Sequence, residues 1–185
     1  MSTLSVTTLQ GLASSPTPTT IEVQSGHKLT GAAGSMVTPG MTLQTLEGFS
    51  YTRVTSTNQT FVDTGVSVAI TPKFATSKVL IICKNTFEVN SNVNARAGLR
   101  LLRGSTNIAE IDNMIAYNYN TGEAHVTGGT GVGIVLDSPN TTSSITYKTQ
   151  FCNNVDLGGT VYCNADDSSS YERSRGSIIV MEIAQ

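Results

Sequence analysis

The residues best suited to acid–base chemistry are two carboxylates two positions apart, Glu110 and Asp112. On a β-strand such a pair shares one face, where it could bind a cation or act as general acid and base. Two carboxylates on one strand are also an ordinary solvated surface, and we favour that interpretation. Asp166 and Asp167 lie in a Ser-rich stretch and could bind Ca²⁺, but the ligand spacing and the glycine of an EF-hand loop are missing.

No other pattern in the sequence predicts catalysis. The nucleophile motif G-x-S-x-G is absent, and two histidines, His27 and His125, are too few to build both a catalytic triad and a metal site. The glycine-rich run at 128–133 lacks the G-x-G-x-x-G order and a following lysine, so it does not predict a phosphate-binding loop. We therefore expect a protein that is not an enzyme and that carries no cofactor or metal.

Three cysteines, Cys83, Cys152 and Cys163, occur without a C-x-x-C spacing. Cys83 follows an apolar run that begins at Val79, and Cys152 follows Phe151. We expect buried thiols that act as small hydrophobic side chains. A bridge between Cys152 and Cys163 on neighbouring strands stays open as an alternative, although a reducing cytoplasm opposes it.

The composition is polar without being charged. Charged residues make up 13% of the chain, against about 25% in typical globular domains. Disorder combines low hydrophobicity with high net charge, whereas this chain has a net charge of −2 and a hydrophobic fraction of 38%, enough for one core. Because 11 basic residues against 13 acidic ones form no basic stripe, we expect no nucleic-acid partner.

Two further absences bear on location. No stretch approaches the roughly 20 consecutive apolar residues that span a bilayer, so we expect no membrane partner. Residues 1–12 lack the charged and apolar regions of a secretion signal. From this we expect a protein that is made in a cytoplasm and either stays there or leaves by lysis.

From Phe49 onward, runs of alternating apolar and polar residues predict half-buried β-strands separated by turns. In the segment 108–117, Ile108, Ile111 and Ile115 have helical spacing, and there a helix and a strand are equally plausible. With about eight to ten strands and no alternation with helices, we expect an all-β fold, an antiparallel β-sandwich of jelly-roll-like type, over residues 49–185. The expected strands cover 49–56, 60–72, 77–90, 95–103, 106–112, 123–137, 144–153, 160–164 and 177–184.

Residues 1–48 differ from the rest, being rich in Thr, Ser, Gly and Pro with few apolar residues. Two short alternating phrases in this segment cannot bury much in a lone chain, but they could in copies wound together or laid on a partner. We interpret the segment as an extended N-terminal arm, or a short shaft, for attachment or trimerisation, with a floppy tail as the alternative. The apolar residues of the two phrases are Leu4, Val6, Leu9, Ile21 and Val23.

Two polar loops are candidates for contact with a sugar or a protein surface. Tyrosine rings stack on flat ligands, and amides offer paired donors and acceptors. The signal is weak, because loop tips of many β-sandwiches have similar sequences. The candidate residues are Tyr117, Asn118, Tyr119 and Asn120 in one loop and Asp166 and Asp167 in the other.

The segment 61–72, FVDTGVSVAITP, with 76–81, TSKVLI, resembles a module found in structural proteins of bacteriophages, especially marine and cyanobacterial phages. Segments 101–106, 136–142, 145–151 and 178–185 continue the resemblance, and residues 1–6 resemble a phrase often fused ahead of the module. The resemblance implies a component of the virion, commonly trimeric, that contacts other virion proteins of the tail, collar or capsid. It marks a building block and assigns no active site.

Three functions follow as hypotheses. The first is a non-enzymatic virion structural protein, a short fibre or appendage of the tail or collar that docks by its arm and displays the sandwich; its alternative form is a capsid decoration protein that stabilises the head shell. The second, compatible with the first, is binding of a host-surface glycan through the loops. The third, a polysaccharide-degrading enzyme, is disfavoured by the short chain and its few acidic residues.

Overall fold

A computed structural model describes residue 25 and residues 37–119, 122–123, 125–155, 159–164 and 174–185. Over these residues the chain is all β, as the sequence predicts, and no helix is long and apolar enough to cross a membrane. The strands are β1 (Thr42–Ser50), β2 (Val54–Ser56), β3 (Val62–Ile70), β4 (Lys78–Ser91), β5 (Ala95–Arg103), β6 (Thr106–Asn118), β7 (His125–Asp137), β8 (Ile145–Asn153), β9 (Thr160–Cys163) and β10 (Gly176–Ile183).

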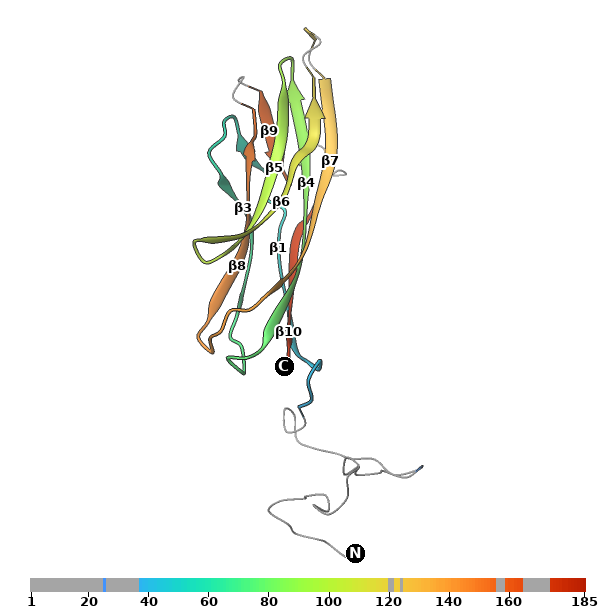
Figure 1. Ribbon diagram of the computed structural model, residues 1–185. Helices are drawn as coiled ribbons and strands as arrows, with labels where there is room; N and C mark the ends of the chain where they lie inside the picture. Colours follow the sequence, from blue (N-terminus) through green and yellow to red (C-terminus); the bar gives the residue numbers. More distant parts are fainter. Residues whose placement is uncertain (1–24, 26–36, 120–121, 124, 156–158, 165–173) are drawn as a thin grey trace, which may run out of the picture. The chain divides into compact units, whose positions relative to one another are not determined.

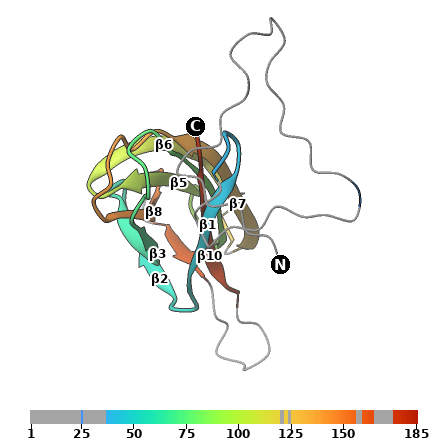
Figure 2. The same cartoon turned by 90° about the horizontal axis from the view of Figure 1, so that it is seen from below.

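The strands form two antiparallel sheets that pack face to face, which confirms the predicted sandwich (Figures 1 and 2). Sheet B has the order β3-β8-β5-β6. In sheet A, β7 pairs with one edge of β4 from Val79 to Ser91. On the other edge of β4, β10 pairs with residues 78–84 and β9 pairs with residues 87–90. The strands β1 and β2 lie beyond β10 and β9. Sheet A is therefore four strands wide at each level, and the strand order is that of a jelly roll.

The core divides into two apolar halves because alternate residues of each strand point between the sheets. One half surrounds Tyr147 of β8, and the other surrounds Phe87 of β4 and Phe151 of β8, whose ring centroids are 5.7 Å apart. The three cysteines are buried free thiols, as predicted, and the alternative Cys152–Cys163 bridge is absent. Burial raises the pKa of the Cys163 thiol to about 12, so this thiol is protonated and inert at neutral pH.

A buried polar layer lies between the two halves of the core. Thr64 of β3 and Thr149 of β8 place their hydroxyl oxygens 2.6 Å apart, and Asn164 donates to the Thr64 carbonyl at 2.9 Å. Asn85 of β4 donates in turn to the Asn164 side chain at 3.3 Å. All four residues are fully buried. The layer links both sheets through directional bonds, which apolar packing alone does not provide.

Two sequence-based expectations change. The boundary expected between residues 48 and 49 falls inside β1, which pairs with β10 along its length, and the compact unit of the sandwich begins at Val37. The cause is that the apolar residues of β1 are sparse, so its alternation is weak. The segment 108–117, left open between helix and strand, belongs to β6 and pairs with β5 through several register shifts.

Candidate functional site

β7 carries its large apolar side chains on the outside of the sandwich. Its outward positions are even-numbered, and four of them hold aliphatic residues that remain more than half exposed. A long edge strand with exposed aliphatic residues and no charge to protect it tends to associate with other protein surfaces. The four residues are Val126, Val132, Ile134 and Leu136, at 64%, 56%, 70% and 53% exposure.

Three successive inward positions of β7, Gly129, Gly131 and Gly133, hold glycines because neighbouring strands, β6 above all, approach too closely there for side chains. A Cβ added at Gly129 would lie 2.8 Å from the backbone nitrogen of Ala116 in β6. Added Cβ atoms at Gly131 and Gly133 would clash with side chains of the sheet B strands. The pairing of β7 with β4 runs without a register shift, so these glycines mark close packing and not a β-bulge. β7 therefore cannot turn its aliphatic face inward.

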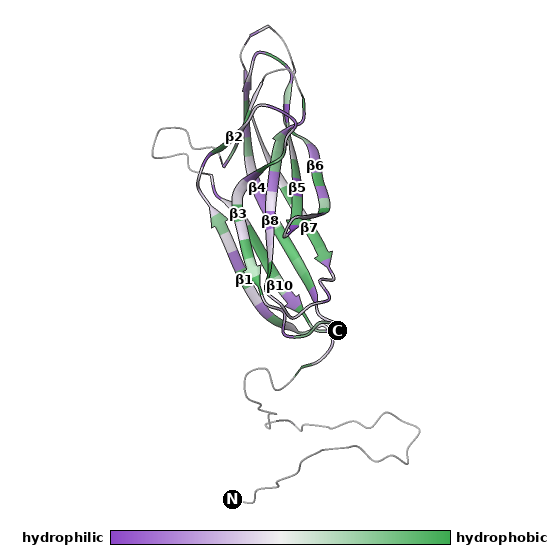
Figure 3. Cartoon of the chain, turned by 90° about the vertical axis from the view of Figure 1, so that its left-hand side faces the viewer, coloured by the Kyte–Doolittle hydropathy of each residue, from purple (hydrophilic) through white to green (hydrophobic). Residues whose placement is uncertain are grey.

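Neighbouring strands extend this outward surface in level rows. The register aligns Leu136 with Leu80 and Met181, and the next row aligns Ile134 with Ile82 and Ile179. The β4 and β10 members are partly exposed. In Figure 3 the lower parts of β7 and β10 contain hydrophobic colouring, which includes residues of both faces of the sheet. We call the following eight residues the apolar block: Leu80, Ile82, Val132, Ile134, Leu136, Ile179, Met181 and Ile183.

Polar and charged residues surround the apolar block. Lys78 lies at its lower margin and Lys84 at its upper margin, both on the outward face of β4. On the β1 side, Glu47 is aligned with Ile179 and forms an ion pair with Arg175. An aliphatic area with a polar rim is the arrangement found at protein–protein contact sites.

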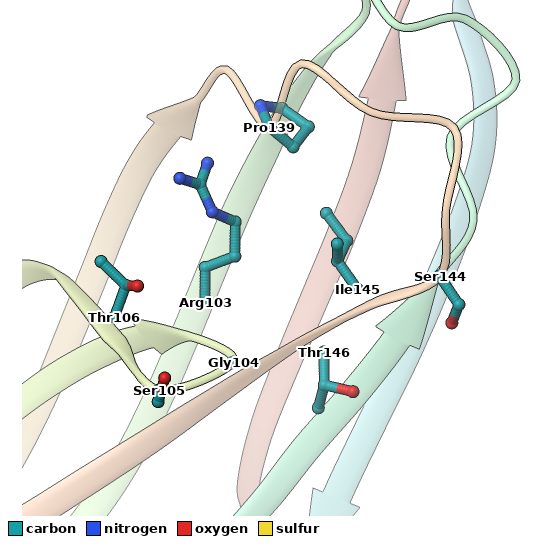
Figure 4. Close-up of a pocket in the computed structure, with 8 residues that line it drawn as sticks. All are labelled: Arg103, Gly104, Ser105, Thr106, Pro139, Ser144, Ile145 and Thr146. Atoms are coloured by element: carbon teal, nitrogen blue, oxygen red, sulfur yellow. The ribbon is translucent and has the colours of Figure 1, made fainter.

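A separate hollow of about 490 Å³ lies where the β5–β6 turn meets the loop before β8 (Figure 4). Arg103 reaches into it, and its guanidinium donates to both carboxylate oxygens of Asp137, at 2.9 and 2.8 Å. The buried Tyr147 hydroxyl donates to the same carboxylate at 2.7 Å. Burial and this carboxylate both raise the pKa of Tyr147, so the phenol stays protonated. The lining residues are Arg103, Gly104, Ser105, Thr106, Pro139, Ser144, Ile145 and Thr146.

The loop residues predicted for surface binding separate into two groups. Tyr117 and Tyr119 are exposed and place their ring centroids 6.4 Å apart. The prediction that Asn118 contacts a ligand is wrong. The residue is buried, and its amide donates to the carbonyls of Ser91, at 2.7 Å, and His125, at 2.9 Å. This side chain holds two strand ends together and is not available to a ligand.

The remaining predicted site residues give no cluster. Glu110 and Asp112 are both exposed, and each accepts a hydrogen bond from its own strand, from the Asn107 side chain and the Met114 backbone nitrogen respectively. Within the described part of the chain, no three His, Cys, Asp or Glu residues are grouped to hold a metal ion. Outside the described residues lie Asn120, Asp166, Asp167, His27 and the apolar residues of the arm, Leu4, Val6, Leu9, Ile21 and Val23.

No protein-family model and no curated protein matches the chain. Association through the apolar block would remove aliphatic surface from water, at about 25 cal/mol per Å². The alternation of Val132, Ile134 and Leu136 was visible in the sequence, but alternation alone does not tell an outward face from an inward one.

Proposed function

We propose that this chain is a non-enzymatic structural subunit of a bacteriophage particle. In this proposal it forms a short fibre or appendage of the tail or collar. Residues that precede β1 attach it to the particle, and the jelly roll is displayed outward. The observation that carries the proposal is the apolar block, because an outward aliphatic surface with a polar rim suits a protein that works inside an assembly.

Three features support this function together. The sandwich is stiffened by antiparallel pairing in both sheets and by a buried polar layer, as suits a structural part. Phrases such as 61–72 resemble those of phage structural modules. The outward face of sheet A then offers a contact surface that the rest of the fold does not use.

The test is incorporation into particles. A variant that lacks residues 1–36 keeps the whole compact unit of the sandwich, which begins at Val37. We expect this variant to remain folded by circular dichroism and to be missing from purified particles, whereas the full chain is incorporated. Normal incorporation of the shortened chain would contradict attachment through the N-terminal segment.

The hollow beside Arg103 favours a second function, the binding of a host-surface glycan. Its volume of about 490 Å³ lies within the range of roughly 300–1,000 Å³ that small-ligand sites occupy. Hydroxyls of Ser105, Thr106 and Thr146 can exchange hydrogen bonds with sugar hydroxyls. Arg103 is held in place by Asp137, so its guanidinium is oriented before a ligand arrives. An outward-facing appendage and a glycan site are compatible in one particle.

A further inference from the structure

The hollow beside Arg103 contains one charged side chain, and a neighbouring carboxylate balances its charge. Of the eight residues that line the hollow, only Arg103 is charged. Its guanidinium forms an ion pair with Asp137 at 2.8 Å, and the same carboxylate accepts a hydrogen bond from the Tyr147 hydroxyl at 2.7 Å. The Asp137 side chain is only 12% exposed. The pair therefore offers a ligand hydrogen-bond donors but no net charge.

The guanidinium of Arg103 is held along one side. Its three hydrogen bonds to described residues all use Nη1: two go to the Asp137 carboxylate and one, at 3.4 Å, to the carbonyl oxygen of Ser138. The Nε and Nη2 groups form the other edge of the planar guanidinium, where two N–H bonds lie in parallel. The side chain keeps 31% of its surface exposed. Its free edge is suited to two neighbouring oxygen atoms of one ligand.

The other lining side chains add hydroxyl and aliphatic groups around the same opening (Figure 4). The hydroxyls come from two segments, the β5–β6 hairpin and the start of β8. A saccharide ring combines hydroxyls on its edge with aliphatic C–H groups on its faces, so it matches this mixture. The hydroxyl-bearing residues are Ser105, Thr106, Ser144 and Thr146, and the aliphatic ones are Pro139 and Ile145.

The Asp137 carboxylate opposes an acidic ligand. An anion at the Nε–Nη2 edge would lie across the same guanidinium from this carboxylate, and two like charges at such short range repel. The lining that the structure describes holds no second cation to offset the repulsion. A neutral ligand avoids this cost and still uses both donors. The arrangement thus favours an uncharged ligand with two adjacent hydroxyls.

We propose that the hollow binds an uncharged saccharide in preference to an acidic one, with two adjacent sugar hydroxyls accepting hydrogen bonds from Nε and Nη2 of Arg103. The lining hydroxyls complete the polar contact, and the side chains of Pro139 and Ile145 contact C–H groups of the ring. The inference rests on the glycan binding proposed above as a second function, and it names the class of ligand.

The experiment measures binding of the full chain to pairs of oligosaccharides that differ in charge at carbon 6. The probes are neutral oligosaccharides of glucose, galactose and mannose, each beside the uronic-acid oligosaccharide of the same linkage, and the method is isothermal titration calorimetry. We expect the neutral member of a pair to bind about tenfold more tightly, because the uronic acid adds a like charge near Asp137. Thr146→Val replaces a lining hydroxyl by a methyl group and should weaken neutral binding several-fold.

A charge-removing variant tests the cause of the preference. Asp137→Asn removes the balancing charge but keeps an oxygen that accepts from Arg103, and we expect it to lose the preference for the neutral saccharide. The matched control is Glu47→Gln, which removes the carboxylate of another arginine ion pair, with Arg175, on β1 of sheet A. This control should keep the preference of the unaltered chain.

Equal or tighter binding of the acidic saccharides by the unaltered chain would overturn the inference. So would a preference that Asp137→Asn retains, or binding that Thr146→Val leaves unchanged. The comparison on the unaltered chain decides even if Asp137→Asn fails to fold. Absence of binding to every probe would refute the inference together with glycan binding, whereas the structural role is tested separately by incorporation into particles.

Discussion

The side-chain amide of Asn164, at the end of β9, donates a 2.9 Å hydrogen bond to the carbonyl oxygen of Thr64 in β3. This bond crosses from sheet A to sheet B in the middle of the core. Asn164 also has a φ of 53°, a left-handed conformation that Asn tolerates better than most residues. One residue thus ends a strand, turns the chain and ties the two sheets together.

Replacement of Asn164 should destabilise the fold for two separable reasons. Asn164→Ala removes the bond to Thr64 and places a Cβ-bearing residue without a compensating side chain in the left-handed region, and we expect a loss of about 2–4 kcal/mol. Asn164→Gly loses the same bond but tolerates the backbone conformation, so its loss should be smaller. Urea denaturation of both variants measures the difference. Equal stability of Asn164→Ala and the unaltered chain would rule out this role.

The two faces of β7 should respond in opposite ways to a single methyl group. Gly129→Ala places a Cβ against the backbone nitrogen of Ala116, which cannot move freely, and we expect a loss of about 1–3 kcal/mol. Gly128→Ala is the control one position away: its Cβ would meet nothing closer than 3.9 Å. We expect this variant to be neutral or slightly stabilised in a melting experiment. Similar melting temperatures for the two variants would contradict the assigned orientation of β7.

Acid should lower the stability of the fold by protonating Glu182 of β10. This carboxylate is buried. Burial alone would raise its pKa, but hydrogen bonds from Gln44 and from the backbone nitrogens of Lys73 and Phe74 outweigh burial and lower the pKa below its ordinary value. A carboxyl with a lower pKa in the folded than in the unfolded chain stabilises the fold above its unfolded pKa. That stabilisation is lost as the pH falls through the folded pKa.

The free energy of unfolding should therefore decrease as the pH falls below about 4.5. Glu182→Gln cannot titrate, so its stability should fall less steeply over the same range. Part of the slope should survive in this variant, because hydrogen bonds from Gln150 and Lys148 also lower the pKa of Asp63 against the effect of partial burial. Denaturation curves at several pH values provide the comparison. Identical slopes for the two proteins would exclude Glu182 as a source of acid sensitivity.

Glycan binding at the hollow should depend on the planar guanidinium of Arg103. Arg103→Lys keeps a positive charge beside Asp137 but loses the paired donors, and we expect at least a tenfold weaker response to any glycan that the full chain recognises on an array. Arg100→Lys is the matched control, because Arg100 stacks on Phe61 and bonds to Gln150 on the face of sheet B. An equal loss in both variants would point away from the hollow.

The sequence predicted most strands because period-two alternation survives wherever one face is buried. The strand expected at 95–103 coincides with β5. β1 was weakly marked: its outward and inward residues differ little in polarity, and its pairing partner, β10, is more than a hundred residues away. Contacts of that range are set by the whole topology and leave no local pattern.

The candidate site was harder to predict, for a physical reason. Gly131 and Gly133 alternate with Val132 and Ile134, and that pattern is the same whether the aliphatic face points to the core or to water. The deciding factor is the close approach of Ile111 and Ile115 on β6, which fills the space inside β7. The prediction for Asn118 was wrong for a different reason. Its place in an Asn-rich segment suggested a ligand site, but its amide donates to backbone carbonyls of the protein itself.

The proposal that this chain is a structural part of a phage particle can be tested by quantitative mass spectrometry of particles purified through a density gradient. We expect the intact chain to stay with the particles through the gradient and to be present in a fixed ratio to the major shell or tail proteins. If the chain is produced during infection but separates completely from the particles, it is not a structural subunit of them.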